Sequence, residues 1–221
     1  MGRYLNQELC DEIKKQLSPI FLKLYKTSPS YKKLGESNIK LADRINRNSS
    51  IRAELSELQK VILEKSISSK YSGLMDAFSY ILRIEVIATY FIDLTLLLLV
   101  GEGACIHLNP DNKHNYVRHA TSLQDIESPS LSLYVKLDFL ETHDIKIFKK
   151  NIDRNLRNSI AHGFFFVDDN GNFYIIDSKG KKIKKDLKQK IKQLDEFLNA
   201  MLIVFSDEIC KVSGLPERPR D

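Results

Sequence analysis

The stretch DIKIFKKNIDRNLRNSIAHG, residues 144–163, has an apolar residue at nearly every third or fourth position. This spacing follows the 3.6-residue repeat of an α-helix, so one helix is predicted from Asp144 to Ala161 or His162. Asp144 is the predicted N-cap, and Gly163 is predicted to end the helix. The predicted core-facing stripe consists of Ile145, Phe148, Ile152, Leu156 and Ile160.

The predicted polar face of this helix contains no acidic residue, although solvated helix faces usually mix Glu with Lys. Its members are hydrogen-bond donors: Lys150, Asn151, Arg154, Arg157, Asn158 and His162. Asn158 and His162 are four positions apart and are therefore neighbours on a helix, so the amide can orient the imidazole. Arg157 and His162 are five positions apart, which separates them by about 140° on an ideal helix. They would converge more easily if two chains packed this face together about a two-fold axis.

The same periodicity predicts further helices on both sides of this stretch. They cover about residues 4–26, 38–68, 71–100 and 185–212, and another begins after Ser128, the predicted N-cap. Pro19 is expected to bend or break the first of them. The most apolar segment, Val86–Val100, is shorter than the ~20 residues of a membrane-spanning helix and contains Asp93. It is therefore predicted to be a buried core helix, and no membrane partner is expected.

Between residues 163 and 185 the pattern changes to that of β-strands. Phe164–Val167 and Phe173–Ile176 are β-prone, and the turn sequence DDNGN at 168–172 joins them, which is a strong hairpin signal. The predicted fold class is therefore all-α (mostly α), a helical bundle with a small β-hairpin before the C-terminal helix. The predicted organisation is an N-terminal helical extension over 1–68, packed on a bundle domain over 69–221.

The composition is that of a globular chain rather than a disordered one, with 221 residues, 43% hydrophobic and 29% charged. A net charge of +5 and a pI of about 8.9 permit binding to a polyanion without demanding it. Lysines are dense between Lys179 and Lys192, and such a run either follows an RNA backbone or, more commonly, forms a solvated face. The three cysteines are far apart and lack metal-ligand spacing, which favours reduced thiols and a cytoplasmic location.

No motif for a metal or a cofactor is present in the sequence, so none is expected. The remaining histidines form no cluster with metal-ligand spacing; they are His107, His114, His119 and His143. Ser159 lies three residues before His162, but the chain has no nucleophile-elbow motif, so a serine hydrolase is not predicted.

The segment Arg157–His162, RNSIAH, resembles the R-x(4–6)-H motif of the HEPN family (higher eukaryotes and prokaryotes nucleotide-binding domains). The resemblance implies a HEPN-like bundle over about residues 71–212. It also implies a metal-independent endoribonuclease that cleaves single-stranded RNA at a homodimer interface. His162 would then act as general base or acid, Arg157 would clamp the phosphate, and Asn158 would position one or both. The other donors of the face would bind RNA: Lys150, Asn151 and Arg154.

Two further interpretations remain open. One is a catalytically inactive HEPN-like module that binds RNA or nucleotides. The other is a helical protein-interaction domain in which Arg157 and His162 only stabilise the helix C-terminus. HEPN toxins often carry a tyrosine two residues after the histidine, where this chain has Phe164. A toxin-like role in defence or stress response, with an antitoxin or regulatory partner, is therefore expected only from the resemblance.

Overall fold

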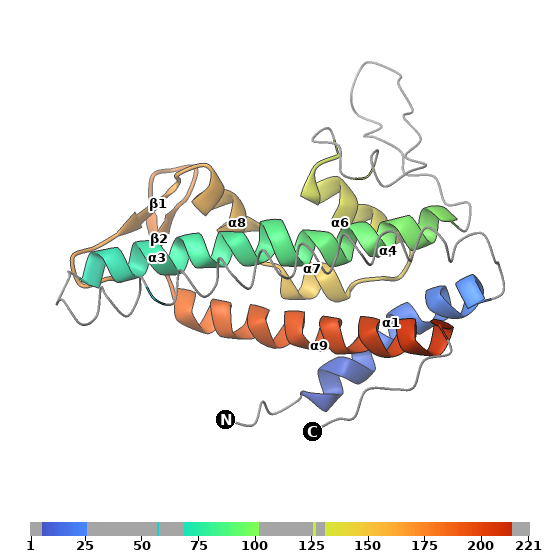
Figure 1. Cartoon of the computed structure of the whole chain (residues 1–221). Helices are drawn as coiled ribbons and strands as arrows, with labels where there is room; N and C mark the ends of the chain where they lie inside the picture. Colours follow the sequence, from blue (N-terminus) through green and yellow to red (C-terminus); the bar gives the residue numbers. More distant parts are fainter. Residues whose placement is uncertain (1–5, 26–56, 58–68, 102–125, 127–130, 214–221) are drawn as a thin grey trace, which may run out of the picture. The chain divides into compact units, whose positions relative to one another are not determined.

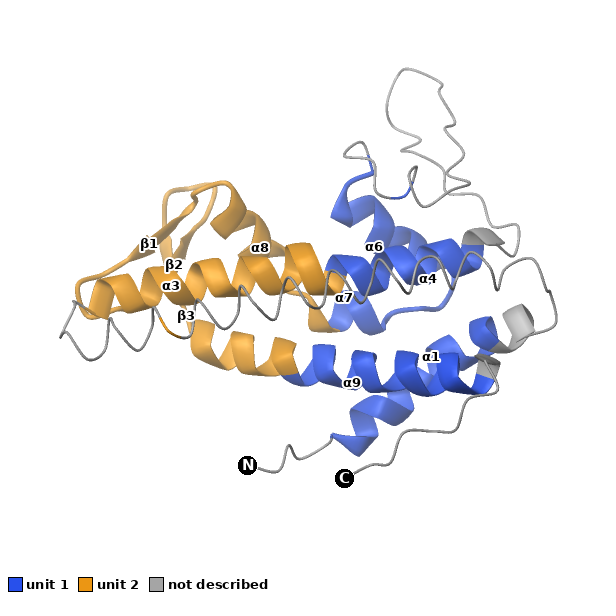
Figure 2. Ribbon diagram, in the orientation of Figure 1, with its two compact units in different colours: residues 1–40, 89–150, 196–221 blue, residues 41–88, 151–195 orange. Residues whose placement is uncertain are grey.

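The computed structural model describes residues 6–25, 57, 69–101, 126 and 131–213, which are mostly helical (Figure 1). Within these residues the only sheet has three antiparallel strands. Contacts divide the chain into two compact units (Figure 2): unit 1 takes in the described parts of 1–40, 89–150 and 196–221, and unit 2 those of 41–88 and 151–195. The helix expected over 38–68, and most of the expected extension over 1–68, lie outside the described residues.

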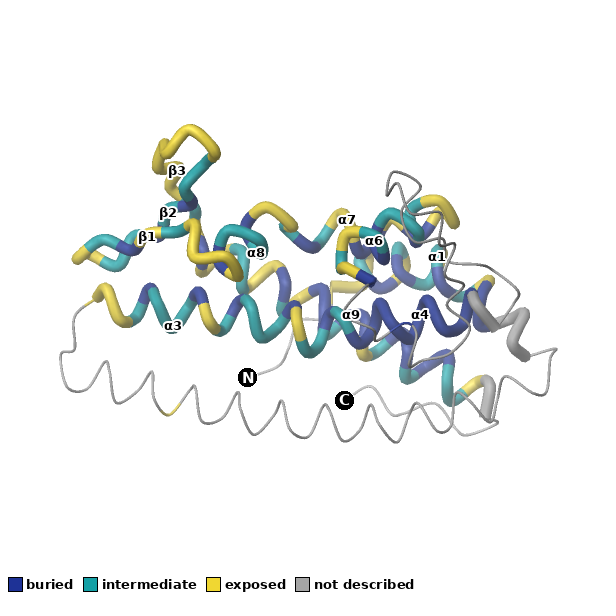
Figure 3. Tube along the Cα trace, turned by 90° about the horizontal axis from the view of Figure 1, so that it is seen from above, coloured by how far each residue is buried: buried dark blue, intermediate teal, exposed yellow. Residues whose placement is uncertain are grey.

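Unit 1 is built on an apolar core. It contains α1 (Gln7–Tyr25), α4 (Thr89–Gly101), α6 (Leu133–Thr142), most of α7 (Ile147–Asn151) and the second half of α9 (Leu187–Ser213). Every residue from Tyr90 to Leu99 is buried, as Figure 3 shows along α4, so the prediction of a buried core helix there is confirmed. None of the helices in the described part of the chain combines the length and apolarity needed to cross a membrane.

Aromatic rings from helices distant in sequence fill the core of unit 1. The ring of Phe205 lies with its centroid 5.3 Å from that of Phe21 and 5.0 Å from that of Phe91. The rings of Phe148 and Phe197 meet edge to face at 5.9 Å. Aromatic pairs of this kind stabilise a fold by more than the burial of their apolar surface alone. Contacts between rings therefore help to hold α1, α4, α7 and α9 together.

Pro19, which was expected to bend or break the first helix, lies inside α1 and does not end it. One expectation for unit 1 needs correction. The helix expected after Ser128 begins only at Leu133, because the hydroxyl of Ser132 accepts a hydrogen bond from the Val135 amide at 3.4 Å and caps the helix there.

Unit 2 holds α3 (Ser69–Leu82), η1 (Arg83–Ala88), α8 (Arg154–Ala161), the three strands and the first residues of α9. η1 is a π-helix that interrupts the continuous helix expected over 71–100. Arg83, at its start, donates two hydrogen bonds to the carboxylate of Asp195 in α9, at 2.8 and 3.0 Å. This bidentate pair joins η1 to α9 within the unit.

The single helix expected over 144–162 is two helices, and this is the main error of the sequence prediction. Ile152 and Asp153 separate α7 from α8, because Asp153 caps α8 by accepting a hydrogen bond from the Leu156 amide at 3.0 Å. Asp144, the expected cap, has a left-handed φ of 61° and lies before α7. The amides of Lys146, just before α7, and of Ile147, its first residue, instead donate to the side-chain oxygen of Gln16 at 2.8 and 2.9 Å. All five residues of the expected apolar stripe are nevertheless buried.

The predicted hairpin is confirmed as β1 (Phe165–Val167) and β2 (Phe173–Ile176), which pair antiparallel. A third strand, β3 (Lys182–Lys185), pairs with β2 and was not predicted. Its sequence, KIKK, has a single apolar residue and resembles the start of a helix. Exposed lysines are, however, common on edge strands, where they discourage pairing with other chains.

The turn between β1 and β2 requires glycine at position 171. Gly171 has φ +78°, and a Cβ placed there would lie 2.5 Å from the carbonyl oxygen of Ser69. Gly180 has nearly the same φ, +76°, but open space around it. We expect Gly180→Ala to cost about 1–2 kcal/mol of unfolding free energy from backbone strain alone. Gly171→Ala should cost about 1–3 kcal/mol more because of the clash. Denaturant unfolding of both variants measures the difference, and equal losses would contradict the close approach of this turn to α3.

Candidate functional site

Arg157 is held in place by two neighbours in unit 2. Its Nε donates to Glu85 Oε1 at 2.6 Å, and its Nη2 lies 2.5 Å from the same oxygen. Its Nη1 donates to Asn158 Oδ1 at 3.1 Å. Only 22% of the Arg157 side chain is exposed. The guanidinium is therefore fixed on three nitrogens, and it still has N–H donors to spare.

Glu85 was missed in the sequence and belongs to the site. It lies in the π-helix η1, 72 positions before Arg157. π-helical turns occur frequently at functional sites, because they rotate the side chains that follow relative to an α-helix. The only signal in the sequence was an acidic residue directly before the apolar run at 86–100, and nothing in the local pattern linked it to Arg157.

His162 is at the end of α8 and open to solvent. It is the C-cap, with its backbone N–H donating to the Asn158 carbonyl at 3.0 Å, and Gly163 leaves the helix with φ +74°. The residue is exposed, and its imidazole forms no hydrogen bond or ion pair with any residue that the structure describes. Asn158, which was expected to position one or both of the pair, contacts Arg157.

The N-terminal end of α8 is anchored within the same unit. The Tyr80 hydroxyl donates to the backbone carbonyl of Asp153 at 3.5 Å, and Lys190 lies 3.5 Å from the Asp153 carboxylate. Burial raises the pKa of the Tyr80 hydroxyl above its ordinary range, so this donor keeps its proton under all physiological conditions. α8 is thus fixed at its start, while His162 is exposed at its end.

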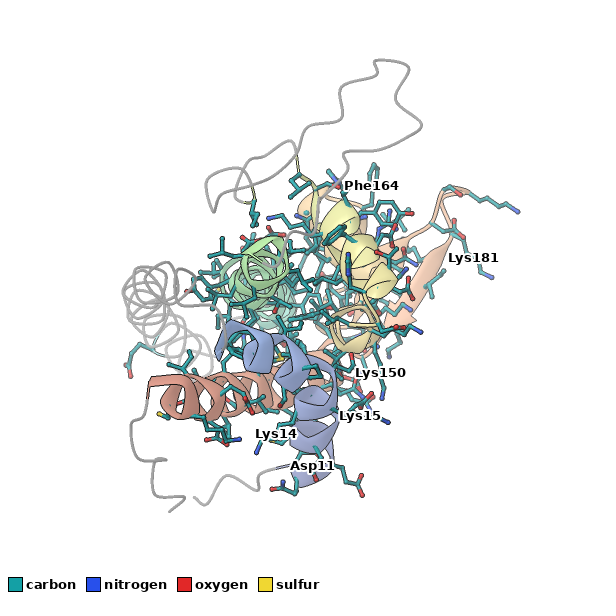
Figure 4. All side chains as sticks on the ribbon, turned by 90° about the vertical axis from the view of Figure 1, so that its right-hand side faces the viewer. Asp11, Lys14, Lys15, Lys150, Phe164 and Lys181 are labelled. Atoms are coloured by element: carbon teal, nitrogen blue, oxygen red, sulfur yellow. The ribbon has the colours of Figure 1, made fainter. Side chains whose placement is uncertain are left out.

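The three remaining expected donors are divided between the two units: Lys150 belongs to unit 1, and Asn151 and Arg154 belong to unit 2. Lys150, which is labelled in Figure 4, lies in α7 in unit 1. Its ammonium binds both carboxylate oxygens of Glu12, at 2.9 and 2.8 Å. Asn151 is partly buried and Arg154 is exposed, and both make contacts of their own. The face has no acidic residue of its own, but Glu12 from α1 supplies a carboxylate to Lys150.

Asp168, in the turn between β1 and β2, serves local structure. No three His, Cys, Asp or Glu side chains gather as a metal site in the described ranges. Asp168 accepts hydrogen bonds from Asn172 and from the Tyr174 hydroxyl. These bonds stabilise the turn between β1 and β2. The bonds from Asn172 hold the pKa of the Asp168 carboxyl below its usual value.

No family model, curated protein or solved structure matches the chain. The resemblance to HEPN domains therefore rests on the segment Arg157–His162 alone.

Proposed function

We propose that this protein is a metal-independent endoribonuclease that cleaves single-stranded RNA, with Arg157 and His162 in its active site and a HEPN-like fold. The observation that supports this most is the contrast between the two side chains on one short helix. Arg157 is fixed by Glu85 and Asn158, whereas His162 is exposed and unengaged. A fixed guanidinium suits a phosphodiester, and an exposed imidazole can accept and return a proton.

The reaction needs only groups that the chain and the RNA supply. His162 takes the proton of a ribose 2′-hydroxyl, whose oxygen attacks the adjacent phosphorus. The bond from phosphorus to the 5′-oxygen breaks, and that oxygen receives its proton from the His162 imidazolium, which returns to the neutral form. The products are a 2′,3′-cyclic phosphate and a 5′-hydroxyl. Arg157 stabilises the charge that develops on the phosphate oxygens, and DNA, which has no 2′-hydroxyl, is not a substrate.

The proposed active site is completed by two subunits. Arg157 lies in α8, and His162 caps its C-terminus five positions later, a spacing that corresponds to about 140° on an ideal helix. A two-fold dimer would allow the Arg157 of each subunit to act with the His162 of its partner. A cytoplasmic role in defence or stress response, with an antitoxin or regulatory partner, follows from the resemblance alone.

The test of the proposed activity is incubation of end-labelled single-stranded RNA with the full chain in excess EDTA. We expect cleavage that leaves 2′,3′-cyclic phosphate ends, no cleavage of DNA of the same sequence, and no cleavage by His162→Ala. Binding of RNA without cleavage at micromolar protein would overturn the proposal in favour of an inactive RNA-binding module. Loss of activity on adding EDTA would contradict the metal-independent mechanism.

Mixing two inactive variants tests the shared site. Arg157→Ala and His162→Ala subunits are each expected to be inactive alone. After unfolding and refolding together, half of the dimers combine both variants, and each of these has one intact site. We therefore expect about a quarter of the wild-type activity to return. A mixture as inactive as its components would rule out a site that takes one residue from each subunit.

Glu85 is expected to act as a positioning residue for Arg157. Glu85→Gln keeps the size of the side chain but removes its charge, so the guanidinium is held less firmly. We expect the rate of cleavage to fall about tenfold, with a loss of unfolding free energy below about 1 kcal/mol because the pair is partly exposed. Kinetics and denaturant unfolding of the same preparation separate the two effects. A rise in activity would show instead that Glu85 competes with phosphate for Arg157.

A further inference from the structure

The small sheet of unit 2 has one covered face and one open face. Side chains alternate between the two faces of a strand. Val167, Phe173 and Ile175 point to the covered face and are buried, and a Cβ added at Gly73 in α3 would clash with Val167. The strand register aligns Phe166 with Tyr174, and Tyr174 with Lys184, on the opposite face.

The open face carries aromatic rings beside cations. Phe166 is 37% exposed, and its ring centroid lies 6.1 Å from that of Tyr174. The ammonium of Lys182 rests 3.8 Å above the centre of the Phe166 ring. Just before β1, Phe164 is 58% exposed, and its carbonyl accepts a hydrogen bond from the Ile176 amide at 2.9 Å, which extends the ladder by one step.

The lysines of this region have no acidic partners among the residues that the structure describes. None of four exposed lysines forms an ion pair there: Lys179, Lys181, Lys182 and Lys184. Figure 3 shows the hairpin that carries them as exposed, and Figure 4 shows Lys181 at its tip. The two nearest carboxylates in sequence bind backbone amides. Asp177 accepts hydrogen bonds from the amides of Lys179 and Lys181 at 2.9 and 2.8 Å, and Asp186 accepts one from the Gln189 amide at 3.0 Å. One carboxylate lies beside this face, since the Tyr174 hydroxyl donates to Asp168 at 3.2 Å, but it forms no ion pair with these four lysines. The lysines are therefore available to bind an external anion.

We propose that this open face, formed by Phe166, Tyr174, Lys182 and Lys184 and called here the sheet platform, binds single-stranded RNA. Bases would stack on Phe166 and Tyr174, and the lysines would contact the phosphates. Stacking needs bases that are not already paired in a duplex, which favours a single strand over double-stranded RNA. A second copy of the chain is disfavoured as the occupant, because two such faces would bring like charges together.

The position of Lys182 is compatible with this role. A cation over an exposed ring is held more weakly than a base stacked on an aromatic side chain. An arriving base can therefore take the ring face of Phe166, while the ammonium turns to a neighbouring phosphate. The cation in the unbound structure marks where positive charge already gathers beside the ring.

The sheet platform adds an RNA-binding surface to the proposed ribonuclease. That the bound strand is also the substrate rests on the proposed function. His162 and β1 are separated only by Gly163 and Phe164, so one short segment joins the proposed catalytic histidine to the first strand of the platform. The platform would hold about two or three nucleotides next to the cleaved bond. This is about the number of bases that stack on other RNA-binding sheets.

A binding assay that does not depend on cleavage tests the platform. The probe is a fluorescent single-stranded 2′-O-methyl RNA decamer, which lacks the attacking hydroxyl, titrated into the full chain. We expect Phe166→Leu, which keeps apolar bulk but loses the aromatic face, to weaken binding about tenfold. Lys184→Gln should weaken binding several-fold and lower the slope of log affinity against log salt by about one. Lys15→Gln, an exposed lysine of α1, is the matched control and should stay within about twofold of wild type.

The outcomes separate the platform from the proposed activity. Wild-type affinity in both Phe166→Leu and Lys184→Gln, no binding of the decamer by the wild type, or equal affinity for duplex RNA would each overturn the platform. Cleavage of native RNA with an unchanged KM in Phe166→Leu would overturn the platform while leaving the ribonuclease intact. Decamer binding that depends on Phe166, in a protein that never cuts native RNA, would support the platform and reject the ribonuclease. Denaturant midpoints of the variants establish that each is folded.

Discussion

Replacing His162 with alanine is expected to reduce the cleavage of single-stranded RNA by about 10²–10⁴-fold, the usual contribution of a general acid or base. The effect on folding should be small, because the imidazole is exposed and has no partner among the described side chains. We expect the unfolding free energy to change by less than about 0.5 kcal/mol. Initial rates of cleavage in EDTA and denaturant unfolding provide the two measurements.

His143 offers a matched control for this experiment. It is also an exposed histidine at the C-cap of a helix, α6, but it lies in unit 1, and its ring contacts Phe139 at 4.6 Å. His143→Ala should therefore retain wild-type cleavage. If both variants lost the same amount of cleavage activity, the effect would come from protein stability or net charge. His162 would then have no specific role in the reaction.

Lys136→Met is expected to cause a large loss of stability. Lys136 in α6 and Asp93 in α4 form an ion pair of 2.6 Å, with only 6% and 4% of their side chains exposed. Removing the ammonium leaves the Asp93 carboxylate buried without this partner, and breaking a buried pair in this way typically costs about 3–5 kcal/mol. Denaturant unfolding of the variant measures the loss.

Two further variants identify the cause of that loss. Lys136→Met combined with Asp93→Leu removes both charges, so most of the lost stability should return. Lys149→Met breaks an exposed pair on the neighbouring segment, where Lys149 binds Asp138 and Glu141 at 2.9 and 2.5 Å with 43% of its side chain exposed. It should cost much less, because water screens exposed pairs. A double variant as unstable as Lys136→Met would attribute the effect to packing rather than to the loss of this ion pair.

The proposed site also explains why Arg157 tolerates a carboxylate beside it. Hydrogen bonds to Glu85 and Asn158 fix the orientation of the guanidinium plane. The side chain therefore loses less conformational entropy when a phosphate binds. The arrangement carries a cost, since the carboxylate repels the same phosphate. The Glu85→Gln experiment shows which of the two effects is larger.

Local periodicity was sufficient to predict most of the helices, the β1–β2 hairpin and the buried face of α7 and α8. These features depend on backbone hydrogen bonds between residues close in sequence and on a repeat of apolar side chains, so a short window of sequence contains them. The same holds for Arg157 and His162 as candidates, because their spacing is itself a local pattern.

Only the tertiary structure decided where these local elements end and which charged side chains form ion pairs. The helix broke at Asp153, where a side-chain cap competed successfully with an apolar repeat that continues through the break. The strand β3 formed from a lysine-rich segment because β2 offered an edge to pair with. Glu85 reached Arg157 across 72 positions, and Lys136 met Asp93 between two helices. Ion pairs of this kind depend on the packing of distant segments, and no local repeat in a sequence specifies which distant partner a charge will find.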